Sequence, residues 1–212
     1  MAQYFSIHPQ NPQPRPIQQA AQLLREGGVL AVPTDSGYAL ACHLDDKDAV
    51  TAIRRIRRLD DKRLLSLLCR DLSELASYAR VDNTQFRLLR AATPGPYTFI
   101  LEASKEVPRR VSHPSRKTIG LRVPDHPALR ALLTEHGAPL LASTLILPDD
   151  EQEGQETPLS DPEEIRRRLD RQIAAVIDAG PCPSEPSTII DLTGGAPQLI
   201  RAGRGDVKRL GL

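Results

Sequence analysis

Aromatic side chains, cysteines and excess charge are all scarce in this chain, and each shortage excludes a class of protein. Aromatic residues make up 3% of the 212 residues and tryptophan is absent, so the core must be built from leucine, isoleucine, valine and alanine. The net charge of +1 excludes a global basic field, and any binding of nucleic acid must use a local patch. No apolar run approaches the length of a membrane span, so no membrane partner is expected.

The sequence also lacks the common signatures of metal and nucleophile chemistry. Its three cysteines form no Cys-x-x-Cys pair and its five histidines show no ligand spacing, so neither a disulfide framework nor a metal site is predicted. Glycine-rich phosphate loops, the GxSxG elbow and the HExxH motif are all missing. An enzyme with this composition would work by positioning substrates and stabilising charge. The first residues form no secretion signal, which predicts a cytoplasmic protein.

The pattern that remains is that of a globular α/β protein. Apolar residues make up 40% and charged residues 26%, and helical and strand-like segments alternate along much of the chain. We expect one domain with a twisted mixed sheet and helices on its outside. Helices are predicted at 15–26, from an Asp45-Asp46 cap through Ile56, and at 71–78, 82–91, 126–136 and 163–172. Strands are predicted at 29–32, 38–42, 64–69, 97–101, 118–123, 140–147, 174–177, 188–192 and 199–202.

The segment 30–44, LAVPTDSGYALACHL, is the stretch around which the chain is organised. Two apolar runs flank Pro33-Thr34-Asp35-Ser36-Gly37, where proline removes a backbone donor and glycine adds freedom, so the strand must break or bend there. Hydroxyls and a carboxylate at the end of a buried strand are typical of a small-ligand site in an α/β fold. The alternative, which the residues alone favour slightly, is a tight turn in which Thr34 and Asp35 only satisfy nearby backbone groups.

A cluster of arginines follows on the second helix. Arg54, Arg55, Arg57 and Arg58 include pairs at spacings where like charges repel by roughly 0.2–0.5 kcal/mol, and Arg63 adds to the cluster. A bound anion such as a phosphate, a nucleotide or an RNA backbone would offset this repulsion, whereas the alternative is a solvated face. Lys62 adds to the cluster as well, and further cations that could join it are Arg109, Arg110, Arg116, Lys117, Arg201, Arg204, Lys208 and Arg209.

Several motifs in one order resemble the YrdC/YciO family, whose best-known members are threonylcarbamoyl-adenylate synthases. They are VPTDSGYALAC, TPGPYTFIL, TIGLRVPDHPAL, APLLASTL, PSTIIDLT and LIRAGRGDV. The chain is most similar to the YciO branch, through IHPQNPQPR, CRDLSEL, KEVPRR and SDPEEI. The resemblance runs from about residue 15 to 205, which leaves 1–14 as an N-terminal lead-in and 206–212 as a C-terminal tail. Within the domain, the acidic residues 149–161 are predicted to form a surface loop.

The resemblance implies a YrdC/RibB-like fold, a twisted α/β sheet with a positively lined concave face. It also implies a reaction in which threonine, bicarbonate and ATP, with Mg²⁺, give threonylcarbamoyl-adenylate and pyrophosphate for a tRNA modification. The implied ligands are therefore a nucleotide and a threonine-like small molecule. Thr34 and Tyr38 match the motif that lines the threonine pocket, while the turn at 94–98 and Arg122 match further pocket positions, with Arg122 as an anion contact. The positions near the adenylate phosphate are matched by Ser187 and Arg201.

Two departures from the family pattern bear on the activity. The Lys-x-Arg-Pro motif of the synthases corresponds to Arg57-Arg58-Leu59-Asp60, which keeps a cation at Arg57 and loses the second at Leu59. Their Ser-x-Asn motif corresponds to Thr144-Leu145-Ile146, which keeps the hydroxyl and loses the amide. Each lost contact is worth roughly 1.5–3 kcal/mol, which predicts weakened ATP handling unless a nearby cation substitutes, namely Arg58, Lys62 or Arg63.

Three functions stay open at this point. The first is a synthase-like enzyme of reduced or altered activity. The second is a module that holds double-stranded RNA or tRNA on a basic face without chemistry. The third is an α/β domain whose pocket serves another small metabolite. The candidate substrate- and nucleotide-binding residues are Thr34, Tyr38, Arg57, Arg58, Arg122, Thr144, Ser187 and Arg201, and no catalytic residue or metal ligand is assigned.

Overall fold

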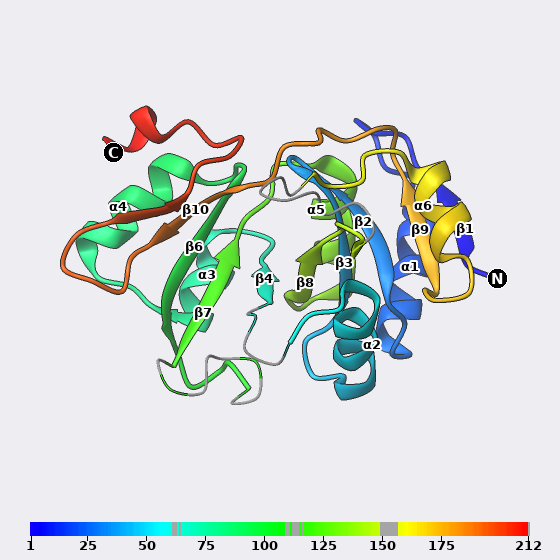
Figure 1. The fold of residues 1–212 in the computed structure, drawn as a ribbon, viewed down its shortest axis with the longest axis horizontal. Coiled ribbons are helices and arrows are strands. Elements are labelled where there is room, and N and C mark those ends of the chain that lie inside the picture. Colours follow the sequence, from blue (N-terminus) through cyan, green and yellow to red (C-terminus); the bar gives the residue numbers. More distant parts are fainter. Residues whose placement is uncertain are drawn as a thin grey trace.

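The computed structural model describes residues 1–60, 63, 65–108, 111, 115, 117–148 and 157–211. In these residues one sheet contains the strands β1 (Gln3–Ser6), β2 (Leu30–Thr34), β3 (Gly37–His43), β4 (Ser66–Leu68), β5 (Ala79–Arg80), β6 (Tyr97–Ala103), β7 (Thr118–Arg122), β8 (Leu140–Thr144), β9 (Ala175–Asp178), β10 (Thr188–Asp191) and β11 (Gln198–Arg201). The helices are α1 (Pro14–Arg25), α2 (Lys47–Arg57), α3 (Leu72–Tyr78), α4 (Asn83–Ala92), α5 (Pro127–His136), α6 (Pro162–Leu169) and the 3-10 turn η2 (Val207–Leu210). The predicted α/β domain, with helices outside a mixed sheet, is confirmed (Figure 1).

The order of the strands brings distant parts of the chain together at the centre of the sheet. It reads β1-β9-β2-β3-β8-β4-β7-β6-β10-β11, with β5 paired to β6. β3 runs antiparallel to β2 and to β8, whereas β4 is parallel to β7 and β10 is parallel to β6. The strands β3, β8, β4 and β7 therefore lie side by side although they span most of the sequence.

Two clusters of buried side chains cover the two faces of the sheet. In β2, Leu30 and Val32 pack in the cluster that contains α1 and α5. Ala31, between them, packs in the cluster that contains α2, α3, α4 and α6. This alternation is the period of a strand, and both faces of β2 are covered, which explains its continuous apolar sequence.

Aspartates begin four of the helices. The carboxylates of Asp46, Asp71, Asp82 and Asp161 each accept a backbone N–H from the first turn of α2, α3, α4 and α6 respectively. Such caps satisfy donors that have no partner within the helix. The acidic helix starts seen in the sequence therefore mark these boundaries to within a few residues. None of the described helices is both long and apolar enough to cross a bilayer.

The sequence does not predict two of the strands. β1 lies within the expected lead-in and pairs in parallel with β9, from Gln3 beside Ala175 to Ser6 beside Asp178. β5 has two residues and pairs with β6. Both strands are too short to show an alternation of apolar and polar residues. Other predictions lie outside the described residues, namely those for Lys62, Arg109, Arg110, Arg116 and residues 149–156 of the acidic segment.

A pair of histidines joins α5 to the end of β3, and it predicts how stability depends on pH. His136 Nε2 lies 3.0 Å from His43 Nδ1. Burial, with smaller contributions from the charges of His43 and Arg25, lowers the pKa of His136 from 6.5 to about 4. Between these values the unfolded chain binds a proton that the folded protein does not, so the free energy of unfolding falls as the pH falls. We expect a loss on the order of 3 kcal/mol over this range, measured by urea unfolding.

The variant His136→Gln serves as the control for this prediction. It removes the titrating ring, so its free energy of unfolding should change less with pH between 6.5 and 4 than that of the natural protein. Equal slopes in the two proteins would show that His136 is not the group responsible.

Candidate functional site

The turn between β2 and β3 uses the Thr34 hydroxyl completely. Thr34 Oγ1 donates to Gly37 O at 2.6 Å, and it accepts from Ser36 N at 3.1 Å and from Arg122 Nη2 at 3.2 Å. A hydroxyl has one proton and two lone pairs, so these three contacts leave no hydrogen-bonding position for a ligand. Gly37 has a φ of 114°, which favours glycine. The stretch is a turn, as expected, but the interpretation that Thr34 and Asp35 only satisfy nearby backbone groups is wrong, because both contact Arg122.

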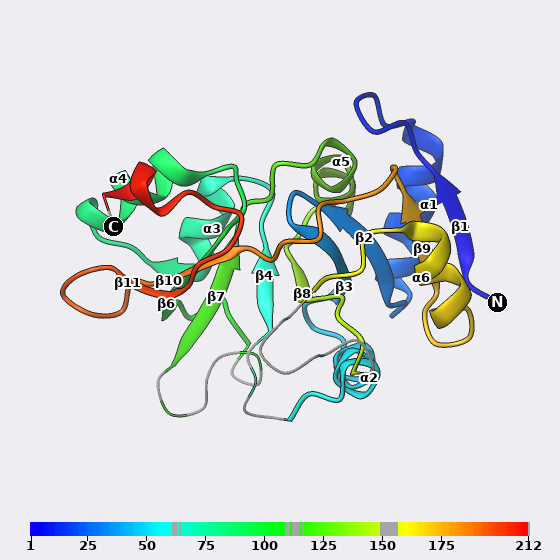
Figure 2. The same cartoon turned by 45° about the horizontal axis from the view of Figure 1, so that its top comes forward.

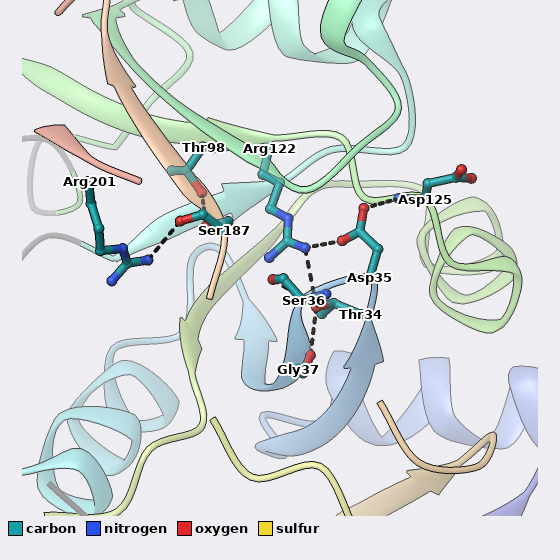
Figure 3. Close-up of polar contacts among 9 residues, drawn as sticks. All are labelled: Thr34, Asp35, Ser36, Gly37, Thr98, Arg122, Asp125, Ser187 and Arg201. Atoms are coloured by element: carbon teal, nitrogen blue, oxygen red, sulfur yellow. Dashed lines mark hydrogen bonds and ion pairs between the residues drawn. The ribbon is translucent and has the colours of Figure 1, made fainter. Parts of the chain in front are cut away.

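Arg122, the last residue of β7, connects this turn to the rest of the site (Figure 3). Its Nη2 donates to Thr34 Oγ1 and forms an ion pair with Asp35 Oδ1. Asp35 Oδ2 in turn accepts the backbone N–H of Asp125 at 2.9 Å. Arg122 is 5% exposed, and its Nε has no hydrogen-bond partner among the described residues. A buried N–H without a partner costs free energy of folding. The Nε of Arg122 is therefore suited to donate a hydrogen bond to an acceptor atom of a ligand.

Four arginines meet at a small cavity of about 160 Å³. They are Arg57 at the end of α2, Arg63 in the loop that follows, Arg122 of β7 and Arg201 of β11, and no carboxylate is among the described residues that line the cavity. Arg57 is only 4% exposed, so its charge lies inside the protein and not on an outer face. Guanidinium groups that line one cavity present several charged donors in one place, so the cavity is suited to a phosphate or a carboxylate. Hydroxyls complete the polar lining, from Ser66, Thr98, Ser143, Thr144 and Ser187.

A pair of hydroxyls lies between the two arginines of β7 and β11 (Figure 3). Thr98 Oγ1 and Ser187 Oγ are 2.8 Å apart, and Arg201 Nη2 donates to Ser187 O at 3.1 Å. Thr98 belongs to β6, and Ser187 directly precedes β10, which pairs with β6. This strand pairing therefore brings Thr98 and Ser187 together across 89 positions of sequence.

A second, larger cavity of about 850 Å³ lies next to the first. Thr34 and Asp35 line it, and both contact Arg122, which lines the small cavity, so the two spaces adjoin at these three side chains. Ligand pockets commonly measure roughly 300–1,000 Å³, so the large cavity can hold the body of a small molecule and the small one its charged group. The remaining walls of the large cavity include Pro94, Pro96, Tyr97, Pro181, Pro183, His126, Glu185, Arg204 and Arg209.

The arginine cluster of α2 is divided among several roles. Arg57 lines the small cavity, as does Arg63 beyond the helix. Arg54 Nη1 instead donates to the carbonyl oxygens of Asp60 and Arg63 at 2.5 and 3.1 Å, so it fastens the loop after the helix. Arg58 ends α2 in the left-handed conformation, with a φ of 49°, and is exposed. Of this cluster, Arg57 and Arg63 lie where an anion in the small cavity could contact them, whereas Arg58 lines neither cavity.

The structure brings together most of the residues singled out from the sequence. Thr34 lines the large cavity. Tyr38 and Arg58 line neither cavity. Tyr38 is fully buried, its hydroxyl donates to Gly180 O at 3.0 Å, and burial raises its pKa, so it stays protonated and engaged with the backbone. The residues that line the small cavity are Arg57, Arg122, Thr144, Ser187 and Arg201.

Asp35 was not among the candidate site residues read from the sequence, whereas the structure pairs it with Arg122. The two residues are 87 positions apart, and the pairing depends on β7 ending beside the turn that follows β2. Ser66 and Ser143 were not singled out either, and they enter the cavity because β4 and β8 are neighbours. A single sequence carries no signal for such contacts, since they follow from the strand order.

Cys182 is the one thiol among the described residues that line the large cavity. Burial raises the pKa of the Cys182 thiol to about 11, so the thiol is protonated at neutral pH. In the described part of the chain, no group of three or more His, Cys, Asp or Glu side chains is arranged to hold a metal ion.

Residues 22–203, which include every residue that lines the small cavity, match the family model Sua5_yciO_yrdC, described as "Telomere recombination". The chain belongs to this family. The YrdC/YciO resemblance read from the motifs is therefore confirmed, and the two departures from the synthase motifs, Leu59 and Ile146, both lie in the wall of the small cavity.

Individual relatives show where in the family the chain stands. The YciO protein of Escherichia coli (strain K12) is 52% identical over 208 residues, which is 98% of this chain and 98% of that protein. Its crystal structure matches with a TM-score of 0.93 at 51% identity and covers 99% of this chain and 100% of that chain. A threonylcarbamoyl-AMP synthase of Vibrio vulnificus (strain YJ016) is 29% identical over 164 residues, 76% of this chain and 84% of that protein. The structure of P. abyssi Sua5 complexed with L-threonine has a TM-score of 0.83 at 26% identity and covers 94% of this chain and 57% of that chain.

Proposed function

We propose that the protein binds ATP and a threonine-like amino acid in the two neighbouring cavities, and that its threonylcarbamoyl-adenylate synthase activity is weak or altered. The observation that carries this proposal is the small cavity, where four arginines, one of them paired with Asp35, line one space together with several hydroxyls. A polyphosphate chain is the kind of ligand that several guanidinium groups bind together. The V. vulnificus synthase and the Sua5 complex with L-threonine support the choice of substrates.

The residues of the small cavity would act by positioning and by charge stabilisation. The reaction joins threonine and bicarbonate to the adenylate of ATP and releases pyrophosphate and water. Arg57, Arg122 and Arg201 would hold the phosphates and neutralise the charge that develops on the departing pyrophosphate. Thr144 and Ser187 would orient phosphate oxygens through their hydroxyls. No protein nucleophile is needed, because the amino acid and bicarbonate supply the attacking groups.

The two departures explain why we propose weak activity. Leu59 and Ile146 place apolar side chains in the cavity wall at the positions where the synthase motifs carry arginine and asparagine. Arg63 also lines the cavity, so it is the candidate to substitute for the cation lost at Leu59. None of the described lining residues carries an amide that could replace the asparagine. We therefore expect the phosphates of ATP to be held better than the rest of the nucleotide.

The alternative of double-stranded RNA or tRNA binding is less favoured by the position of the arginines. Arg57 and Arg122 are 4% and 5% exposed, and a duplex cannot bring its backbone phosphates into a cavity of about 160 Å³. Binding of RNA would have to use exposed cations elsewhere. It should then weaken steeply with salt and be unaffected by Thr34→Ala.

The proposal is tested by incubating the protein with ATP, Mg²⁺, threonine and bicarbonate and measuring pyrophosphate. We expect ATP to bind in calorimetry, and we expect slow pyrophosphate release that requires both threonine and bicarbonate. A family synthase measured alongside should be faster. Absence of ATP binding, together with salt-sensitive binding of RNA, would reject the proposal in favour of the RNA-binding module.

A further inference from the structure

The chain after β11 forms a segment, residues 203–210, that we call the C-terminal strap. In Figures 1 and 2 this segment, drawn in red, turns back near the start of β6 and runs toward α4. Its 3-10 turn η2 packs against α4. The match to the family model ends at residue 203, so nearly all of the strap lies beyond it. The proposed function makes no use of this segment.

Specific contacts hold the strap in place. Gly203 N donates to Thr188 Oγ1 at 3.1 Å, and Thr188 Oγ1 donates to Gly205 O at 2.7 Å. The Tyr97 hydroxyl donates to Asp206 O at 3.1 Å. A Cβ atom on Gly205 would lie 2.4 Å from Cε1 of the Tyr97 ring, so only glycine allows the backbone to approach this closely. The strap is therefore seated on β6 and β10.

The seated strap places two cations at the large cavity. Arg204 and Arg209 both line it, on either side of Gly205 and Asp206, which line it as well. Within the part of the chain that the structure describes, neither guanidinium forms a hydrogen bond or an ion pair with another residue. Two partnerless guanidinium groups that face a cavity of about 850 Å³ are suited to an anionic ligand.

The four carboxylates that line the large cavity form their described contacts with groups other than the guanidiniums of Arg204 and Arg209. Asp35 is paired with Arg122. Asp125 Oδ1 lies 4.0 Å from Arg130 Nη1. Asp206 Oδ1 accepts the backbone N–H of Lys208 at 2.9 Å. That backbone contact leaves the charge of Asp206 in place, so Asp206 and Glu185 are the two lining carboxylates for which no cation partner is described. Neither of them forms an ion pair with Arg204 or Arg209 in the described part of the chain, so both guanidinium groups keep their donors for a ligand.

We propose that the strap forms a second phosphate subsite, in which Arg204 and Arg209 bind a phosphate group in the large cavity. This inference rests on the proposed function in treating the two cavities as parts of one ligand site. The phosphate group can belong to a bound nucleotide or to free pyrophosphate, and both present the same oxygens to the guanidinium groups. The strap would then complete the site that the family core begins.

The experiment is calorimetry with ATP, AMP and inorganic pyrophosphate on the full-length protein. The variants are Arg204→Ala, Arg209→Ala and the double variant. Lys208→Ala is the matched control, because Lys208 is an exposed cation of the same strap that lines neither cavity. We expect the double variant to bind at least one of the three ligands with an affinity that is lower by roughly tenfold or more. Lys208→Ala should change the affinity for each ligand by no more than about twofold.

A second variant moves the strap without changing its charge. Gly205→Ala adds a Cβ against the Tyr97 ring. It should therefore lower the affinity for the same ligand that the arginine variants bind less tightly. Its melting temperature is measured alongside, so that a loss of binding is compared between folded proteins. Full affinity in a folded Gly205→Ala protein would count against a strap that must be seated to work.

The outcomes separate this inference from the proposed function. If ATP binds and loses affinity in Arg122→Ala, but all three ligands are unaffected by the arginine variants of the strap, the subsite is wrong and the proposed function stands. If only pyrophosphate or AMP binds, and binding depends on Arg204 and Arg209, the subsite stands and the ATP reaction does not. If none of the three ligands binds to the natural protein, both proposals are rejected.

Discussion

Arg122→Ala is expected to abolish ATP binding in calorimetry, a loss of at least about a hundredfold in affinity. A hydrogen bond to a charged group is worth roughly 1.5–3 kcal/mol, or about 10–100-fold, and Arg122 has a buried Nε without a partner among the described residues. The substitution also leaves the Asp35 carboxylate without its ion pair next to the cavity. An uncompensated carboxylate there repels an incoming phosphate, so the two effects add.

Arg122→Ala also removes a structural ion pair, so its thermal stability must be measured. Two further variants test the site without removing that ion pair. Arg201→Ala removes a guanidinium that lines the same cavity from another strand. It should lower the affinity for ATP by roughly 10–100-fold. Arg55→Ala is the matched control, since Arg55 is an exposed arginine of α2 that lines neither cavity. ATP affinity that is unchanged in both cavity variants would contradict the site.

Leu59→Arg combined with Ile146→Asn is expected to raise the rate of pyrophosphate release by about tenfold or more. Both side chains lie in the wall of the small cavity, where they replace a cation and an amide of the synthase motifs. Restored contacts to the nucleotide are worth roughly 1.5–3 kcal/mol each for a charged partner and about 0.5–1.5 kcal/mol for a neutral one. Because Arg63 already lines this cavity, the asparagine should act even without the added arginine.

Single variants and an apolar control separate polarity from shape in this second prediction. Ile146→Asn alone should show part of the gain, in both the affinity for ATP and the rate. The double variant Leu59→Met with Ile146→Leu changes the shape of the same wall and adds no polar group, so it should leave the rate within about twofold. A gain in the apolar control, or none in the polar double variant, would show that these two positions do not limit the reaction.

Local patterns in the sequence were sufficient for most of the fold. The apolar run of β2 and the aspartate caps of α2, α3 and α4 depend on residues that are neighbours in the chain, and the structure has these elements where the sequence predicts them. β1 was missed because four residues at the edge of a sheet show no clear alternation, and its place is fixed by pairing with β9 far along the chain. No helical turn was predicted in the tail either, and η2 forms there packed on α4.

The candidate site could likewise be predicted only where it depends on local patterns, and not where it depends on contacts between distant residues. The turn at Thr34 was visible in its proline, hydroxyls and glycine, and the family motifs pointed to Arg57, Thr144 and Arg201, which the strand order brings to one cavity. The pairing of Asp35 with Arg122 depends on a contact across 87 positions, which no local pattern reveals. Tyr38 shows the opposite failure, because it lies in the matching motif and yet alternates onto the covered face of β3.

A crystal structure of the protein with a non-hydrolysable ATP analogue tests the central claim most directly. The account predicts phosphate groups inside the small cavity, in contact with the guanidinium groups of Arg57, Arg122 and Arg201. Phosphates bound on an outer surface, with none of these three arginines in contact with the analogue, would contradict it.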